Sequence, residues 1–244
     1  MRRFFCPSEN IRNNKICISD KDTLHHIKDV LRMKPKDEAV IFSEKSDEFK
    51  ACLESVDEEK AQFFIKQALM PSKEQLLKIT VCCAIPKKAK MDEIVDKLTQ
   101  LGVEKIIPLA SDHVIGRMDK QRQKEKVARW QRIAKSASLQ SQRNIIPVVE
   151  EIKTVDEALK ENNAFDLKVI ANLANRPKFL KDVFSPDKHK RILVFIGPEG
   201  DFSAREINLA LENSCVAVSL GETTLRVDTA AIAVVSYIKL SNAC

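Results

Sequence analysis

The sequence is poor in glycine and in large aromatic residues, with five glycines, one tryptophan and one tyrosine among 244 residues. It also lacks any apolar run of the roughly 20 residues that a membrane-spanning helix needs. The first ten residues, MRRFFCPSEN, contain no long apolar core of the kind that a secretory signal has. We therefore expect a cytoplasmic protein with no membrane partner.

The sequence has no metal-binding or disulfide pattern. Its seven cysteines include no CxxC pair, and its four histidines do not cluster at the spacing of metal ligands. Cys82 and Cys83 are neighbours inside an apolar run. This pattern predicts free, buried thiols in a reducing compartment and no metal.

Two common nucleotide-binding motifs are absent as well. Neither GxGxxG nor GxxxxGK[ST] occurs, which argues against a Rossmann dinucleotide site and against a P-loop. Three of the five glycines instead lie in two loops, GPEGDF (197–202) and GETTLRVD (221–228). Because glycine allows a ligand to approach the backbone closely, these loops are candidates for a binding site.

The N-terminal third has the pattern of a small β domain. Short apolar runs with strand-like composition follow one another closely, and a helical stretch at 20–31 interrupts them. The predicted strands are 15–19, 38–43, 49–55 and 61–69. We place the end of this domain at residue 71.

The rest of the chain, 72–244, has the pattern of an α/β domain. Apolar runs of strand length alternate with helical segments, which predicts a parallel sheet covered by helices on both faces. The predicted strands are 79–85, 105–111, 167–173, 191–197 and 215–221. In such sheets ligands bind at the carboxyl ends of the strands, here the loops 172–177, 197–202 and 221–228.

Two helices are expected to start directly after these loops. Ser203 and Glu206 match the Ser-x-x-Glu capping box. Asp228 can cap the last helix, which is apolar on nearly all sides until Lys239. A helix of that composition must be buried in a core or in a homodimer interface.

Positive charge is concentrated in one segment. Residues 117–143 contain nine Lys/Arg residues against Asp119 and Glu125, whereas the net charge of the whole chain is only +6. One interpretation is that these residues form an ordinary helix face exposed to solvent. The concentration of the entire excess in one segment favours a polyanionic partner such as a nucleic acid.

The two glycine loops resemble a known family. IGPEGDFS (196–203) and LGETTLRVDTAAIAV (220–234) are similar to the paired C-terminal motifs of the SPOUT methyltransferases, and more closely to the family of ribosomal small-subunit methyltransferase E. Segments 25–34, 96–111 and 138–147 resemble the same family in the same order. The resemblance covers most of the chain.

The resemblance implies a fold and a function. It implies an N-terminal PUA-like β-barrel (1–71) and a SPOUT α/β domain (72–244) with a parallel sheet and a deep C-terminal trefoil knot. It implies a homodimer that uses S-adenosylmethionine (SAM) and releases S-adenosylhomocysteine (SAH). The implied reaction is methylation of a uridine at N3 in 16S ribosomal RNA, near the decoding site of the small subunit.

Three positions depart from the family pattern. Asp201 stands where the family usually has a second glycine, Thr223 and Thr224 replace an Arg-Ile pair, and Asp228 replaces glutamate. Asp201 brings a carboxylate to the loop and is expected to restrict positive φ values there.

The resemblance also assigns roles to residues. Arg226 is the candidate for stabilising a uracil anion, with the alternative that it pairs structurally with Glu199 or Asp228. Glu199 is a candidate base or a carboxylate that orients its loop. The residues expected at the cofactor are Leu173, Ile196, Gly197, Pro198, Glu199, Gly200, Leu220, Gly221, Thr224, Leu225 and Arg226.

A set of basic residues is expected to contact RNA phosphates, which dominate the affinity of such complexes. Phe4 and Phe5 are candidates for base stacking, with strand-core packing as the alternative. The basic set is Arg2, Arg3, Arg32, Lys87, Lys88, Lys90, Arg117 and Arg143.

Two rival functions remain open at this point. One is a SPOUT enzyme that methylates a ribose 2′-hydroxyl and shares the GPEG-type loop. The other is a non-catalytic RNA-binding factor for ribosome assembly. The substrate is either free RNA or an assembled subunit.

Overall fold

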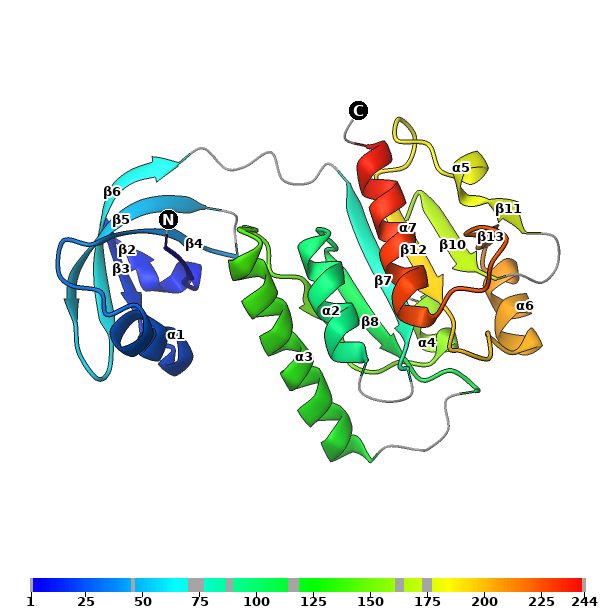
Figure 1. Cartoon of the computed structure of the whole chain (residues 1–244), viewed down its shortest axis with the longest axis horizontal. Coiled ribbons are helices and arrows are strands. Elements are labelled where there is room, and N and C mark those ends of the chain that lie inside the picture. The colour runs from blue at the N-terminus through cyan, green and yellow to red at the C-terminus, as the bar shows by residue number, and fades with distance from the viewer. Residues whose placement is uncertain are drawn as a thin grey trace. The chain divides into compact units, whose positions relative to one another are not determined.

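The structure is a computed structural model that describes residues 2–44, 47–69, 77–86, 90–113, 119–160, 165–172 and 177–242 (Figure 1). The chain divides into two compact units. An N-terminal unit comprises Met1–Glu74 together with Ser138–Ile146. A C-terminal unit comprises Gln75–Ala137 and Pro147–Cys244.

The N-terminal unit is built on a six-stranded sheet of order β1-β4-β5-β6-β3-β2. The β1–β4 pair is parallel and the other pairs are antiparallel. The strands predicted in this half are all present, and the structure adds the short β1 and β2. The bounds are β1 Arg3–Phe5, β2 Ile11–Arg12, β3 Lys15–Ile18, β4 Glu38–Phe42, β5 Glu48–Val56 and β6 Ala61–Leu69.

The predicted helix at 20–31 is also present. It starts as α1 (Lys21–His25), and Asp20 caps it by accepting a hydrogen bond from the backbone N–H of Thr23 at 3.1 Å. It continues as a π-helical turn, η2 (His26–Val30), while a single 3-10 turn, η1, occupies Ser8–Asn10. Ile27 in η2 packs into the same apolar core as the strands.

A segment distant in sequence completes the N-terminal unit. Asn144 is buried and donates a hydrogen bond through its side-chain amide to Glu48 at 3.0 Å. Arg3 bridges the two, because its guanidinium pairs with Glu48 at 2.5 Å and also contacts the amide oxygen of Asn144. The segment Ser138–Ile146 therefore belongs to the hydrogen-bonded interior of this unit.

The C-terminal unit is built on a seven-stranded sheet of order β11-β13-β10-β12-β7-β8-β9, in which every pair is parallel. This confirms the predicted α/β fold with a parallel sheet. The short β9 and β11 were not predicted. The bounds are β7 Lys78–Ala84, β8 Lys105–Leu109, β9 Val148–Val149, β10 Leu167–Ala171, β11 Lys178–Phe179, β12 Arg191–Ile196 and β13 Val216–Ser219.

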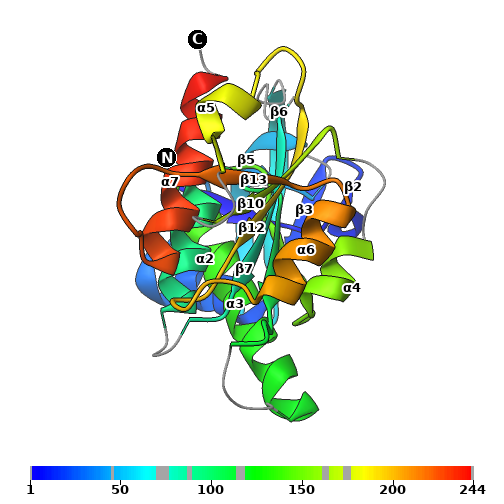
Figure 2. The same ribbon diagram turned by 90° about the vertical axis from the view of Figure 1, so that its right-hand side faces the viewer.

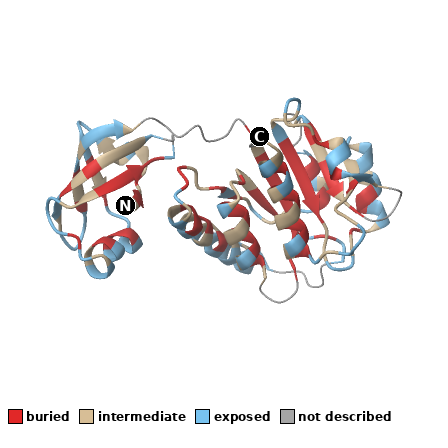
Figure 3. Ribbon diagram, turned by 45° about the horizontal axis from the view of Figure 1, so that its top comes forward, coloured by how far each residue is buried: buried red, intermediate tan, exposed pale blue. Residues whose placement is uncertain are grey.

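Helices cover both faces of this sheet. In Figure 2, α2 and α7 lie on one face, and α4 and α6 lie on the other. Burial follows this layering, since the strands and the inward sides of the helices are buried while their outer sides are exposed (Figure 3). The bounds are α2 Met91–Gln100, α3 Lys120–Gln140, α4 Val155–Lys160, α5 Leu180–Val183, α6 Ala204–Glu212 and α7 Val227–Ser241.

The last helix, α7, differs from its prediction in two ways. Its N-cap is Arg226, which makes no side-chain capping bond, so the prediction that Asp228 caps it is wrong. The N-cap is therefore two residues earlier than expected, and Asp228 lies in the first turn of the helix, where its charge still complements the helix dipole. One face of α7 is buried as predicted, whereas Tyr237 and Leu240 are exposed on this chain.

The six described cysteines are free. Four of them are buried, and burial raises the pKa of Cys6, Cys83 and Cys215 to about 12. These thiols are therefore uncharged at neutral pH and behave as small apolar side chains. Among the described residues, no helix has the length and apolar character needed to cross a bilayer.

Candidate functional site

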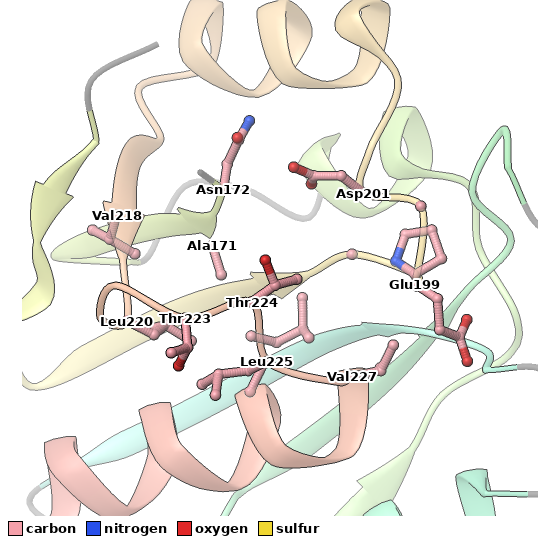
Figure 4. A pocket seen from close by; sticks show the side chains of 15 residues that line it. Ala171, Asn172, Glu199, Asp201, Val218, Leu220, Thr223, Thr224, Leu225 and Val227 are labelled. Atoms are coloured by element: carbon pink, nitrogen blue, oxygen red, sulfur yellow. The ribbon is translucent and has the colours of Figure 1, made fainter. Parts of the chain in front are cut away.

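A cavity of about 290 Å³ lies at the carboxyl ends of β10, β12 and β13, where the sequence predicts a ligand site (Figure 4). Its walls come from the residues that follow each of these strands and from the first turn of α7. The lining residues are Ala171, Asn172, Ile196, Gly197, Pro198, Glu199, Gly200, Asp201, Val218, Leu220, Thr223, Thr224, Leu225, Val227 and Ala230.

Most of the residues expected at the cofactor lie around this cavity. Gly221 and Arg226 are beside the lining but not part of it, and Leu173 lies outside the described residues. The residues expected there that do line it are Ile196, Gly197, Pro198, Glu199, Gly200, Leu220, Thr224 and Leu225.

Seven lining residues were not among the cofactor residues expected from the sequence, although the predicted ligand loops include four of them, Asn172, Asp201, Thr223 and Val227. Ala171 and Val218 lie at the ends of their strands, and Val227 and Ala230 face the cavity from the first turn of α7. The rule that ligands bind at strand ends would have found the first two. The others in this group are Asn172, Asp201 and Thr223.

The loop after β12 is a tight turn whose glycine is required by close packing. The backbone N–H of Asp201 donates to the carbonyl of Pro198 at 2.9 Å and closes the turn. A Cβ on Gly197 would lie 3.1 Å from the ring of Phe202, which is itself buried. A side chain at Gly200 would meet nothing closer than His113 at 3.9 Å. Gly197 is thus the position where the backbone of the loop must approach the Phe202 ring closely.

Asp201 adopts the left-handed backbone conformation, with φ of 62°. The expectation that an aspartate restricts positive φ there is wrong, because aspartate tolerates this region when its short side chain bonds locally. Its Oδ1 accepts a hydrogen bond from the backbone N–H of Phe202 at 2.7 Å. Its carbonyl oxygen lies 2.9 Å from Nδ1 of His113, in the loop after β8.

The start of α6 is anchored by a buried carboxylate. Ser203 and Glu206 form both hydrogen bonds of the predicted capping box, which confirms that prediction. Glu206 is 1% exposed, and its Oε1 also accepts a bond from the backbone N–H of Asp112 at 3.0 Å. One side chain therefore holds the exit of the GPEGDF loop and the loop after β8 together.

Ionic contacts extend this anchor on the surface. Arg205 reaches Asp112 at 3.2 Å and Asp156, in α4, at 3.1 Å. The guanidinium of Arg205 and the hydroxyl of Ser203 hold the pKa of Asp112 below its usual value. No sequence pattern pointed to Asp112, His113 or Arg205, because the contacts connect residues that are about 90 positions apart.

The two candidate catalytic residues are exposed and unpaired with each other. Arg226 forms no ion pair with Glu199 or Asp228 in the described part of the chain, so the alternative of a structural pairing is wrong. Asp228 instead lies 3.5 Å from Lys90. The Glu199 carboxylate points away from the cavity, on the outer side of its loop (Figure 4).

The residues expected to contact RNA have diverse surroundings. Arg143 is buried in the N-terminal unit and Arg3 is half-buried in an ion pair with Glu48, which favours a structural role for both. Arg2 pairs with Asp37 at 2.7 Å, and Arg32 is exposed. Lys87, Lys88 and Arg117 lie outside the described residues.

Of the two candidate stacking residues, Phe4 is in the core of the N-terminal unit and Phe5 is half-buried. Phe4 is buried, and the ring of Phe5 packs edge-on against Phe42 at 5.6 Å. This confirms the alternative of strand-core packing.

The basic helix α3 presents its charges to solvent. Its buried side holds Trp130, whose indole N–H donates to Asp92 at 3.1 Å, and Ala134. Arg129 pairs with Asp92, and Arg122 lies 3.6 Å from Asp119. The exposed basic residues of α3 are Lys120, Arg122, Lys124, Lys126, Arg129 and Arg132.

Comparison with known families matches this architecture. The family described as the RNA methyltransferase domain matches residues 72–239, which include the whole cavity. The family described as the RNA methyltransferase PUA domain matches residues 18–66, within the six-stranded unit. The fold and the site are those of an RNA methyltransferase with an N-terminal PUA domain.

Comparison with individual relatives identifies the family within the RNA methyltransferases. Ribosomal RNA small subunit methyltransferase E of Bacillus subtilis is 30% identical, with 88% of each chain covered. A solved structure of the protein of the same name from Neisseria gonorrhoeae, bound to SAM, is 30% identical, covers 98% of this chain and 97% of its own, and has a TM-score of 0.85. A methyltransferase structure from Legionella pneumophila, also with SAM, is 29% identical, covers 98% and 96%, and has a TM-score of 0.86. The chain belongs to the ribosomal RNA small subunit methyltransferase E family.

Proposed function

We propose that this protein is a SAM-dependent methyltransferase that methylates N3 of a uridine in 16S ribosomal RNA, near the decoding site. The observation that carries the proposal is the cavity at the carboxyl ends of β10, β12 and β13, enclosed by the two glycine loops. Relatives with this fold hold SAM in their solved structures. The name that the curated relatives share supplies the small-subunit RNA as substrate.

The cavity suits the cofactor. Its volume of about 290 Å³ is near the lower end of the range of about 300–1,000 Å³ for small-molecule sites. Gly197 lets its loop pack closely against Phe202, and Leu220, Leu225 and Val218 supply apolar walls. Bound there, SAM supplies an electrophilic methyl group. The backbone of the GPEGDF and GETTLRVD loops would hold it, together with Leu173.

We assign to Arg226 the role of acting on the substrate base. It is exposed and is the N-cap residue of α7, directly after Leu225 in the cavity wall. Uracil N3 carries a weakly acidic proton, so its lone pair becomes available only when the anion on O2 and O4 is stabilised. The Arg226 guanidinium, which pairs with no carboxylate among the described residues, supplies that stabilisation. Glu199, on the outer side of its loop, is the candidate base, with loop orientation as its alternative role.

The wider assembly is part of the same proposal. We place the ribosomal RNA on the exposed basic face of α3 and at Arg32, inside an assembled small subunit in the cytoplasm. The exposed Tyr237 and Leu240 on α7 provide an apolar face for a homodimer. The deep trefoil knot implied by the family resemblance stays a prediction about how the loops of the C-terminal unit are threaded.

The test is a methylation assay on small ribosomal subunits from cells that lack this protein. The purified chain and SAM are added, the RNA is digested, and methylated nucleosides are identified by mass spectrometry. New 3-methyluridine supports the proposal, whereas a 2′-O-methylated nucleoside moves the target to ribose. Failure to bind SAM, measured by calorimetry on the same sample, would point to a non-catalytic RNA-binding factor.

A further inference from the structure

We propose that Asp201 sets the preference of the cavity for the positively charged SAM over its neutral product, SAH. This inference rests on the proposed function, since it requires the cofactor to occupy this cavity. It assigns to Asp201 a role in cofactor specificity and product release.

Among the lining residues that the structure describes, charge comes from carboxylates alone. Of the fifteen lining residues, only Glu199 and Asp201 carry charge, and both are acidic. In Figure 4 the Glu199 carboxylate points away from the cavity, whereas the Asp201 carboxylate points toward the side where Asn172 lies. Asp201 is therefore the side chain that gives the interior of the cavity its negative field.

The carboxylate of Asp201 is held in a fixed position. The backbone at φ of 62° is tied by its N–H to Pro198 at 2.9 Å, and the carbonyl contacts His113 at 2.9 Å. Oδ1 accepts the N–H of Phe202 at 2.7 Å, while Oδ2 accepts no hydrogen bond from the described residues. One oxygen is thus committed to the turn, and the other is available to a ligand.

The backbone conformation explains which residues fit this position. Apart from glycine, asparagine and aspartate enter the left-handed region most readily, because their short side chains bond locally. Of these three, only aspartate carries a charge. Asn and Gly are therefore the two uncharged residues that can replace Asp201 and keep the turn.

The reaction changes the charge that Asp201 faces. SAM carries a sulfonium, an ammonium and a carboxylate, so its net charge is positive. Methyl transfer breaks the bond between sulfur and the methyl carbon and leaves the electron pair on sulfur, which becomes a neutral thioether in SAH. A fixed carboxylate in the wall therefore attracts the reactant more than the product.

The experiment measures dissociation constants of SAM and SAH by titration calorimetry for the wild type, Asp201→Asn, Asp201→Gly and Glu212→Gln. We expect the ratio of SAH to SAM dissociation constants to fall about threefold to tenfold in both Asp201 variants. Added salt should lower this ratio in the wild type and have little effect in Asp201→Asn. Glu212→Gln, which removes the same charge from an exposed side chain of α6 outside the cavity lining, should leave the ratio within about twofold of the wild type.

Three results would overturn the inference. An unchanged ratio in both Asp201 variants would exclude an electrostatic role. If the ratio falls in Asp201→Gly but keeps its wild-type value in Asp201→Asn, the effect comes from the local hydrogen bond and not from the charge. An equal fall of the ratio in Glu212→Gln would show a general effect of net charge. If the wild type binds neither SAM nor SAH, the proposed function itself is refuted. Thermal unfolding followed by circular dichroism checks that each variant is folded.

Discussion

Asp112 and Glu206 are 94 positions apart in the sequence, and the backbone N–H of Asp112 donates to the Glu206 carboxylate at 3.0 Å. The second oxygen of that carboxylate accepts the N–H of Ser203 at 2.9 Å. A buried carboxylate that satisfies two backbone donors is costly to remove, because both donors then lose their partner. The pair therefore holds the end of the GPEGDF loop against the loop after β8.

Glu206→Ala should destabilise the C-terminal unit by about 2 kcal/mol, since it breaks the capping box and leaves buried N–H groups unsatisfied. Urea unfolding followed by circular dichroism measures the change. Glu212→Ala, at the exposed end of the same helix, is the matched control and should cost less than about 0.5 kcal/mol. Equal losses in the two variants would mean that Glu206 is not the anchor.

Asp112 should give the protein an acid-sensitive contribution to stability. Its pKa is lowered by the hydrogen bonds from Arg205 and Ser203, so the carboxylate stabilises the fold above its unfolded pKa and loses that effect as pH falls through the folded pKa. Asp112→Asn should therefore be less stable than wild type by about 0.5 kcal/mol near neutral pH, a modest value because both side chains are exposed. The two unfolding curves should converge as pH falls through the folded pKa of Asp112, which lies below the usual pKa of an aspartate. A difference that persists at low pH would assign the effect to packing.

Gly197→Val should abolish SAM binding. A Cβ at this position would lie 3.1 Å from Phe202 and 3.3 Å from Asp201. The further branched atoms of valine must therefore displace the loop that lines the cavity. Calorimetry with SAM should show at least a tenfold loss of affinity, which corresponds to about 1.4 kcal/mol. Gly200→Ala is the comparison variant, with a smaller loss expected because its Cβ has open space. Normal SAM affinity in Gly197→Val would remove this loop from the cofactor site.

Arg226→Ala should lower the methylation rate on small subunits by about 100-fold to 1,000-fold, the usual cost of removing a donor that stabilises a developing anion. SAM affinity should change little, because Arg226 is outside the cavity lining. Arg226→Lys keeps a positive charge and should recover part of the rate. A rate equal to wild type in Arg226→Ala would exclude this side chain from the chemistry.

The basic face of α3 should contribute to RNA affinity through phosphate contacts. Replacing Lys120, Lys124 and Lys126 with glutamine should weaken binding to small-subunit RNA and reduce the slope of log affinity against log salt by about 2–3. Filter binding over a salt series gives both quantities. The same change at Lys21, Lys160 and Lys188, which are exposed elsewhere, is the control for net charge. An equal effect in the control would show that α3 is not the docking face.

The sheet of the C-terminal unit could be predicted because its signal is local. The central strands are continuous apolar runs, and the capping box after β12 lies within four residues of sequence. The N-cap of α7 lies two residues before the predicted one, since an aspartate such as Asp228 suits both an N-cap and the first turn of a helix. The short β9 and β11 have only two residues each, too few for any periodicity.

The site could be predicted only in its sequence-adjacent part. The glycine loops were recognised from their motifs, but the anchor through Asp112 and His113 depends on pairing between distant segments. The low exposure of the Arg3 and Arg143 side chains could not be predicted from the sequence either. Arginine is mostly exposed in proteins, and the Glu48 partner of Arg3 is far away in the sequence. Long-range hydrogen bonds of this kind leave no periodic trace.

The segment Ser138–Ile146 has a consequence for how the protein can be divided. The N-terminal unit draws Asn144 and Arg143 from the middle of the methyltransferase sequence, so its fold is encoded by two separate stretches of the gene. A cut near residue 71 would strip Arg3 and Glu48 of their amide partner and leave buried polar groups of the excised segment in water. The two halves are therefore not interchangeable modules, and recombination between relatives should preserve function only when both stretches are inherited together.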